Sequence, residues 1–350
     1  MKKNVYKVGI VGLGGMGYWH FDQIDELECV EVSGIYDVDE QIMSDAREAG
    51  VHTFDSVDEM VESSDVDIVL IATPNHFHKD IAVKAMDNGK NVISEKPVTL
   101  NSEMLQQMID ASERNGVIFT VHQNRRWDED FLTIKKIYDN HLLGDVYCVE
   151  SRVHGSRGIP GDWRGTKEAG GGMVFDWGVH IIDQILLLIP EKVTKIYAEK
   201  TNITNKEVDD GFKILATFES GKKAHLEVGT HNFIELPRWY MLGVDGTAVI
   251  DNWNLDGKIM HITDRTQNDA KPIVTAAGLT KTMAPRTKAT VVESALPIVK
   301  SDVGDFYRNV TKTIAGKENQ LITHAQLMRV MKFIEAVFES FETGEVVYFE

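Results

Sequence analysis

The chain has 350 residues, of which 43% are hydrophobic and 26% are charged, close to the averages of soluble globular proteins. Its length suits two domains of ordinary size better than a single core. Because 37 lysine and arginine residues stand against 54 aspartate and glutamate residues, the formal net charge is -17. A surface this acidic repels nucleic-acid phosphates and anionic lipid, so we expect neither nucleic acid nor a membrane as a partner.

Cysteine content and hydropathy bear on the compartment. Cys29 and Cys148 are the only cysteines, too few for a disulfide framework or a cysteine-based metal site, which fits a reducing environment. The N-terminus has a basic start and an apolar stretch, but no small-residue cleavage pattern follows it. The longest apolar run, residues 181–189, contains Asp183 and Gln184 and is too short to span a bilayer. We therefore expect a cytoplasmic protein.

The first third of the chain alternates between strand-like and helix-like segments. Apolar, β-branched runs predict strands at residues 8–11, 30–36, 68–72, 91–94 and 117–121. The segments between them predict helices at residues 14–28, 39–49, 76–88 and 101–116, with a further short helix opened by the capping pair Ser56 and Glu59. Alternation at this pitch indicates a parallel sheet with helices on both faces.

Near Gln123 the pattern changes to one dominated by strands. After a helix at about residues 128–142, residues 212–218 and 224–228 alternate between apolar and polar around the turn at residues 220–221, as in an antiparallel hairpin. A second turn falls at residues 245–246. Residues 264–297 are weakly patterned and suit a long loop at a site or a subunit contact. An amphipathic helix at residues 325–341 and a short strand close the chain.

A glycine motif of the form G-x-G-x-x-G follows the first strand and opens the first helix. Its residues are Gly12, Leu13, Gly14, Met16 and Gly17. The first glycine permits a tight turn, the second lets a pyrophosphate approach the backbone, and the third lets the helix pack close to the sheet. The phosphates would face the positive end of that helix. A turn without a ligand is the alternative; the strand–helix context favours dinucleotide binding.

Asp37 lies at the end of the second strand, 20 residues beyond Gly17. A carboxylate there accepts hydrogen bonds from both ribose hydroxyls of NAD and repels the 2′-phosphate of NADP. No arginine or lysine stands immediately beside it to bind that phosphate. The alternative is an ordinary solvated carboxylate, but with the glycine motif upstream we predict NAD, with NADP less favoured.

The segment Glu95-Lys96-Pro97 follows a strand that would end at the cofactor crevice. Ligands of such sheets lie outside the carboxyl ends of the strands, so Lys96 is expected where a nicotinamide would bind. A lysine there can hydrogen-bond a substrate oxygen and stabilise its alkoxide character. Taken alone, Lys96 could equally be a surface lysine before a turn.

Asp176 and His180 follow the glycine run at residues 170–172. In a helix these two residues would share one face. Histidine is the natural base for a hydroxyl proton near neutral pH, and a nearby carboxylate can orient it or bind a second hydroxyl. The alternatives are a core histidine with satisfied polar atoms and a glycine run that makes only tight turns.

Together these motifs resemble the Gfo/Idh/MocA oxidoreductases, a family that includes inositol dehydrogenases and glucose–fructose oxidoreductase. The resemblance rests on the glycine motif, the acidic end of the second strand, Thr73-Pro74-Asn75, Glu95-Lys96-Pro97 and the Asp176–His180 spacing. It implies an α/β Rossmann domain at residues 1–122 and an α+β domain at residues 123–350. The second domain would have a large, mainly antiparallel open sheet that often makes subunit contacts, hence a homodimer or homotetramer.

The resemblance also implies roles for individual residues. Lys96 and His180 would act at the reacting hydroxyl, and Asp176 would position the substrate. Thr73, Pro74, Asn75 and Glu95 would lie along the dinucleotide, and Arg125, Trp163 and Arg164 would lie near the nicotinamide or the substrate.

We expect no metal site. His76 and His78 cannot share a helix face, and hydride transfer needs no metal when a lysine stabilises the oxygen. Asp176, His180 and Asp183 could also be imagined as ligands, but the same argument makes a metal unnecessary there.

The motifs therefore predict an NAD-dependent oxidoreductase that transfers a hydride reversibly from the carbon of a secondary hydroxyl. The resemblance implies a sugar, polyol or inositol-like substrate. One alternative keeps NAD tightly bound for redox-assisted glycoside cleavage or for a coupled oxidation and reduction. Another is a non-enzymatic dinucleotide sensor, which could retain the glycine motif without Lys96, Asp176 and His180.

Overall fold

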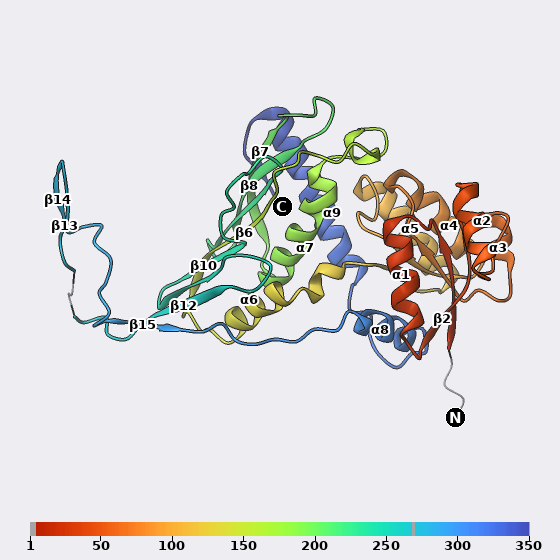
Figure 1. Cartoon of the computed structure of the whole chain (residues 1–350), viewed down its shortest axis with the longest axis horizontal. Coiled ribbons are helices and arrows are strands. Elements are labelled where there is room, and N and C mark those ends of the chain that lie inside the picture. The colour runs from red at the N-terminus through yellow and green to blue at the C-terminus, as the bar shows by residue number, and fades with distance from the viewer. Residues whose placement is uncertain (1–4, 268–269, 350) are drawn as a thin grey trace.

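The structure, a computed structural model, describes residues 5–267 and 270–349. A parallel sheet with its helices forms the N-terminal domain, and a larger sheet forms the opposite part of the molecule (Figure 1). Among the described residues, no helix combines the length and the apolar composition that crossing a membrane would require.

The N-terminal sheet has the strand order β2-β1-β3-β4-β5, and every neighbouring pair is parallel. Its strands are β1 (Tyr6–Val11), β2 (Val30–Tyr36), β3 (Ile68–Ile71), β4 (Asn91–Ser94) and β5 (Phe119–Val121). All four residues of β3 are buried, as expected for a strand covered on both faces. The prediction that β5 begins at residue 117 is wrong, because the Val117 N–H still donates to the Ser112 carbonyl and closes the preceding helix.

Three helices of this domain begin at a side chain that caps the first turn. The helices of the domain are α1 (Gly15–Asp25), α2 (Glu40–Glu48), α3 (Val57–Glu62), α4 (His78–Asp87) and α5 (Ser102–Asn115). Asp39, Ser56 and Asn101 each accept a backbone N–H of the first turn of their helix. The helix predicted at residues 76–88 begins instead as the 3₁₀ turn η1 (Asn75–Phe77), and the one predicted at 14–28 ends at Asp25.

The second sheet has nine strands in the order β15-β12-β11-β10-β6-β9-β8-β7-β16. They are β6 (Val146–His154), β7 (Val193–Thr201), β8 (Gly211–Phe218), β9 (Lys223–Gly229), β10 (Trp239–Gly243), β11 (Gly246–Ile250), β12 (Gly257–Ile262), β15 (Val291–Ser294) and β16 (Val347–Tyr348). The central pair β6–β9 is parallel, and the other pairs are antiparallel. The predicted large, mainly antiparallel sheet and both predicted turns are confirmed.

One face of this sheet is covered by helices and the other is open. Helices α6 (Glu129–Asp139), α7 (Val179–Leu188) and α9 (His324–Thr343) lie between the sheet and the N-terminal domain (Figure 1). On β8, Phe212, Ile214 and Ala216 are buried, whereas Lys213 and Leu215 between them are exposed. This alternation is that of a sheet with one solvated face.

Two features of the fold were not predicted by the sequence pattern. Helix α8 (Gly304–Ile314) returns to the N-terminal domain and packs Tyr307 against His20 of α1. Within the weakly patterned residues 264–297, the hairpin β13 (Ile273–Thr275) and β14 (Gly278–Thr280) stands clear of the rest of the molecule (Figure 1). Strands of three exposed residues leave no periodicity to recognise.

Candidate active site

The glycine loop joins β1 to α1 and has the geometry that its sequence predicts. Gly12 has a φ of 89°, and a Cβ on Gly17 would lie 1.9 Å from the Gly12 carbonyl oxygen, so both positions require glycine. A Cβ on Gly14 would meet nothing within 4 Å. Gly14 is also the N-cap of α1 and gives it no side-chain cap, so its first N–H groups suit an anion. The loop therefore fits a dinucleotide pyrophosphate.

Asp37 is held against this loop by backbone hydrogen bonds. Its Oδ2 accepts the N–H of Leu13 at 2.7 Å, and its Oδ1 accepts the N–H of Asp39 at 2.9 Å. The next residue, Val38, is 90% exposed. The carboxylate is thus fixed at the mouth of the cofactor crevice, where a ribose would follow the pyrophosphate.

The loop after β3 is tied to the second domain and to the loop after β4. Asn75 is buried, and its Nδ2 donates to the carbonyl of Gly170 at 2.9 Å. The ring of His78 lies between the carbonyl oxygens of Thr73 and Pro97, at 2.8 and 2.9 Å. Thr73, Pro74 and Asn75 are therefore brought to the same sheet edge as Lys96.

Lys96 meets Asp176 across 80 residues of sequence. The Lys96 Nζ lies 3.3 Å from Asp176 Oδ1 and 3.1 Å from the Asp176 carbonyl oxygen. Arg164 Nε lies 3.3 Å from the same Oδ1. The side chains of Lys96 and Asp176 are only 15% and 16% exposed, so this is a partly desolvated carboxylate between two cations.

His180 lies in the first turn of α7 and is buried, and its Nδ1 has no hydrogen-bond partner among the residues that the structure describes. Burial, and then the charges of Lys96 and Arg125, hold the pKa of His180 well below its usual value. The imidazole is therefore neutral near pH 7 and able to accept a proton.

Asp176 and His180 do not lie in one regular helix. Asp176 lies in a π turn, η4 (Val174–Gly178), and α7 begins only at Val179. The N–H of Val174 at the start of the turn donates to Asp209 Oδ2 at 2.9 Å, which anchors it. The Asp176 carboxylate pairs with Lys96 and Arg164 instead of orienting His180.

Behind Lys96 lies a buried polar network that the sequence reading missed. Glu95 Oε1 accepts from His20 Nε2 at 2.9 Å and from His122 Nδ1 at 2.8 Å, and Oε2 accepts the Lys96 N–H at 3.0 Å. The Tyr307 hydroxyl donates to His20 Nδ1. No local pattern distinguishes these histidines from ordinary ones, because their partners come from α8 and from two different strand ends.

The protonation of this network follows from its burial. Burial opposes the charge of Glu95, but the hydrogen bonds from His122 and His20 hold the pKa of that carboxyl well below its usual value. Burial lowers the pKa of His20 to about 4. A neutral His20, which donates from Nε2 to an ionised Glu95 and accepts at Nδ1 from Tyr307, satisfies both of its hydrogen bonds.

The side chains of this network are close enough together to coordinate a metal ion. The ligand atoms of His20, Glu95 and His122 lie within 4.8 Å of one another. Direct hydrogen bonds already account for these contacts, so the cluster does not require an ion. The predicted absence of a metal stays a prediction.

Beside Asp176 the second domain encloses a cavity of about 540 Å³. Residues lining it include Arg125, His154, Arg157, Asp176, Trp177 and Trp253. The Arg125 guanidinium lies 4.7 Å from the ring centre of Trp177 and 5.8 Å from that of Trp253. Trp253 comes from the turn after β11, which the sequence reading did not connect to the site.

The three residues that were assigned to the substrate region take different places. Arg125 lines the cavity, and Arg164 reaches Asp176. Trp163 lies in the 3₁₀ turn η3 (Trp163–Gly165), with the Arg164 guanidinium 4.6 Å from its ring centre, so its contact is with Arg164.

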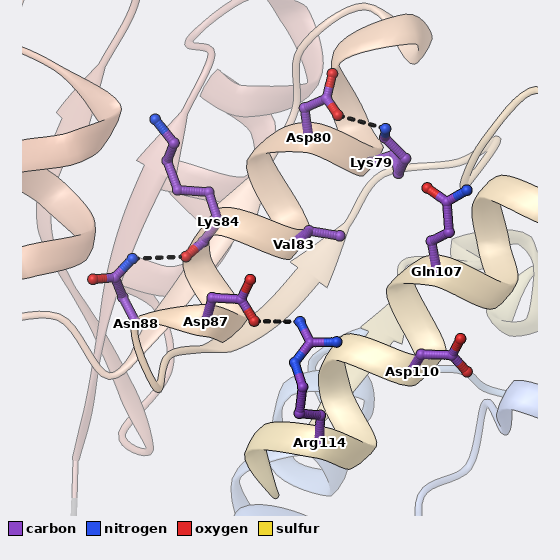
Figure 2. A pocket seen from close by; sticks show the side chains of 9 residues that line it. All are labelled: Lys79, Asp80, Val83, Lys84, Asp87, Asn88, Gln107, Asp110 and Arg114. Carbon is purple, nitrogen blue, oxygen red and sulfur yellow. Dashed lines mark hydrogen bonds and ion pairs between the residues drawn. The ribbon is translucent and has the colours of Figure 1, made fainter.

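A second cavity of about 540 Å³ lies between α4 and α5, away from these residues (Figure 2). Its lining is mostly charged, with Lys79 paired to Asp80 and Arg114 to Asp87. Its described lining contains none of the predicted site residues, so the candidate active site is the one at the carboxyl ends of β3 and β4.

Family comparison agrees with this geometry. Residues 6–123 match the model described as "Oxidoreductase family, NAD-binding Rossmann fold", and residues 131–249 match the "GFO/IDH/MocA C-terminal domain". These matches define a dinucleotide-binding oxidoreductase with two family domains.

Individual relatives extend the likeness over the whole chain. An NAD-binding protein from Listeria innocua has a crystal structure that matches with a TM-score of 0.96 and 42% identity, covering 99% of both chains. The scyllo-inositol 2-dehydrogenase (NADP(+)) IolW of Bacillus subtilis is 28% identical over 100% of this chain and 97% of its own. An uncharacterized oxidoreductase of Streptococcus pneumoniae is 30% identical over 72% of this chain and 70% of its own.

The chain belongs to the Gfo/Idh/MocA family of oxidoreductases, as its motifs predict. It is an NAD(P)-binding enzyme of the dehydrogenase class.

Proposed function

We propose that this enzyme uses NAD to oxidise a secondary hydroxyl of a cyclic polyol or sugar, with Lys96 and His180 at the reacting hydroxyl. The observation that carries the proposal is that Lys96 pairs with Asp176, which lines the cavity, while the charge of Lys96 acts on the buried, neutral His180. A neutral His180 suits the role of a base.

His180 is the base of the proposed reaction. Its unprotonated imidazole accepts the proton of the substrate hydroxyl as the neighbouring carbon is oxidised. Lys96 donates a hydrogen bond to the same oxygen and stabilises the negative charge that develops on it. Bound NAD supplies the hydride acceptor.

Asp176 positions the substrate. Its carboxylate is held by Lys96 and Arg164 and faces a cavity with two tryptophan rings, Trp177 and Trp253. A carboxylate can accept hydrogen bonds from a second hydroxyl, and apolar ring faces can pack against the C–H face of a sugar or inositol. Among the relatives, IolW is named for scyllo-inositol, which supports this substrate class.

NAD is the proposed cofactor. The Asp37 carboxylate, fixed by Leu13 and Asp39, would repel a 2′-phosphate, and the residues after it are Val38, Asp39 and Glu40. IolW is named as NADP(+)-linked, so the choice of cofactor must be measured for this chain.

The quaternary structure and the compartment belong to the same proposal. The open face of the nine-stranded sheet suits a homodimer or homotetramer, because an uncovered sheet with exposed Tyr147 and Leu215 offers a contact surface. Free thiols at Cys29 and Cys148 support a reducing compartment such as the cytoplasm. The domain division at residue 122 stays a proposal.

Substitution of Lys96→Met tests the mechanism. The variant should lose at least about 100-fold in kcat, because the oxygen loses its charged donor, while NAD affinity stays within about threefold of that of the wild type. Steady-state turnover and NAD titration by fluorescence measure the two quantities. Unchanged turnover would rule out the proposed role of Lys96.

The retained-cofactor and sensor alternatives predict other outcomes. A retained cofactor would turn over substrate without net NADH release. A sensor would bind NAD without any turnover in the wild type.

A further inference from the structure

The hairpin that stands clear of the molecule has an unusual surface for this chain. We call residues 270–289 the arm; they include β13 and β14. Val274, Leu279 and Met283 on it are 76%, 69% and 78% exposed. A two-stranded hairpin of this size is at best marginally stable alone, and exposed apolar side chains at its tip need a partner surface.

The charge of the arm is opposite to that of the chain. It carries Lys271, Lys281, Arg286 and Lys288 and no acidic residue, although the whole chain has a formal net charge of -17. A basic and apolar segment on so acidic a protein suits an acidic protein surface.

Such a surface exists on the N-terminal domain. Residues 22–67, which we call the acidic stretch, contain sixteen acidic residues and Arg47 as their only lysine or arginine. All of these acidic residues except Asp37 are exposed. They include Glu40 and Glu48 on α2 and Asp58 and Glu62 on α3.

The arm cannot reach the acidic stretch of its own chain. The arm lies at one end of the long axis of the molecule, and α2 and α3 lie at the other end (Figure 1). The large sheet and helices α6, α7 and α9 lie between them (Figure 1). The complementary surface must therefore belong to another molecule.

We propose that the arm of one copy docks on the acidic stretch of a second copy of this chain. The arm leaves the sheet edge at β12 and β15 and points away from its own N-terminal domain (Figure 1). In one copy the N-terminal domain lies on the helix-covered side of the sheet (Figure 1). If two copies joined through their open sheet faces about a two-fold axis, the partner's N-terminal domain would lie beyond the open face, on the side toward which the arm points. Two reciprocal arms would then close the assembly.

Reversing the charge of the arm tests this docking. The variant Lys281→Glu/Lys288→Glu should weaken self-association by at least about tenfold, because like charges would face each other at the contact. The matched control is Lys317→Glu/Lys332→Glu, which makes the same total change of charge at two exposed lysines outside the arm. Lys317 lies in the turn after α8, and Lys332 lies on α9. Sedimentation equilibrium over a range of concentrations gives the dissociation constants, and circular dichroism confirms that both variants fold.

Cross-linking locates the contact. Isotope-labelled and unlabelled wild-type protein are mixed, and a zero-length carbodiimide reagent joins lysines to nearby carboxylates. We expect mixed-isotope peptides that link Lys271, Lys281 or Lys288 to the acidic stretch.

Three results would overturn the proposal: a monomeric wild type, equal association of the arm variant and its control, or arm cross-links that map outside the acidic stretch. Arm-dependent binding to RNA or to anionic vesicles, with association unchanged, would also overturn it and assign the arm to that partner instead. None of these measurements depends on the dehydrogenase activity.

Discussion

At the scale of single residues, burial decides the charge state that each group can offer. His180 is kept neutral mainly by desolvation, whereas Glu95 stays ionised because two histidines and a backbone N–H donate to it. The base is thus uncharged and the supporting carboxylate is charged, although both side chains are buried. The sequence contains both residues, but only the fold determines which of them is desolvated without compensation.

The adjacent residues Asp209 and Asp210 test whether burial without enough hydrogen bonds keeps a group uncharged, because their pKa values shift in opposite directions. Burial raises the pKa of Asp209 to about 7, although Val174 and Met173 donate to it. Between its unfolded pKa near 3.8 and about 7, the folded state binds the extra proton, so this contribution to stability is lost as pH rises through that window. The variant Asp209→Asn cannot ionise, and it should melt several degrees above the wild type at about pH 8 and near it at about pH 5.

Asp210→Asn is the matched control. Burial raises the pKa of Asp210. Hydrogen bonds from the backbone N–H groups of Thr204 and Asn205 and from the Thr201 hydroxyl lower it by more, so the net shift of the pKa is downward. Its stabilisation is therefore present above the unfolded pKa, and the variant should melt below the wild type at both pH values. Thermal melts followed by circular dichroism supply the data. Equal losses in the two variants at about pH 8 would contradict the assigned charge of Asp209.

At the scale of elements, the glycine loop contains one glycine that the packing of the protein requires and another that only a bound ligand would require. A Cβ on Gly17 would collide with the Gly12 carbonyl inside the protein, whereas a Cβ on Gly14 would point into open space. The two glycines of one motif therefore serve different purposes.

Gly17→Ala should lower the melting temperature by several degrees, because α1 must move away from β1. Gly14→Ala should melt like the wild type and bind NAD at least about tenfold more weakly, since the new methyl group would occupy the approach of the pyrophosphate. Gly15→Ala is the control for Gly14→Ala, because its Cβ also meets nothing within 4 Å. Thermal melts and NAD titrations are the readouts. Unchanged NAD affinity in Gly14→Ala would remove the loop from the cofactor site.

Elements with a strong local signal could be predicted from the sequence, and those defined by distant contacts could not. The strands β1 to β4 and the hairpin β8–β9 follow from apolar runs and alternation. The π turn at Asp176 could not be foreseen, because its anchor, Asp209, lies more than thirty residues away. For the same reason the sequence pointed to Lys96, Asp176 and His180 but gave no sign of the network behind them or of Trp253 in the cavity wall.

At the scale of the whole molecule, the C-terminal helices α8 and α9 pack against the N-terminal domain and stabilise it. Helix α8 places Tyr307 on His20, and Glu335 of α9 accepts the N–H and hydroxyl of Ser102 at the start of α5. These contacts join the end of the chain to the elements that carry the glycine loop and Lys96.

Tyr307→Phe should destabilise the protein by about 1–3 kcal/mol, because the buried His20 Nδ1 loses its donor. Tyr348→Phe, at an exposed tyrosine, should cost almost nothing. Urea unfolding of both variants and the wild type measures the difference. Identical free energies of unfolding in the two variants would show that α8 does not brace the N-terminal domain in this way.

The central claim is hydride transfer from a secondary hydroxyl to NAD, and NADH absorbance tests it most directly. Purified protein is incubated with NAD, and in parallel with NADP, against a panel of inositols, aldoses, glycosides and sugar acids. We expect absorbance to rise with NAD and one or a few cyclic polyols or sugars, and to rise less with NADP. No rise with any compound, although NAD binding is shown separately, would contradict it.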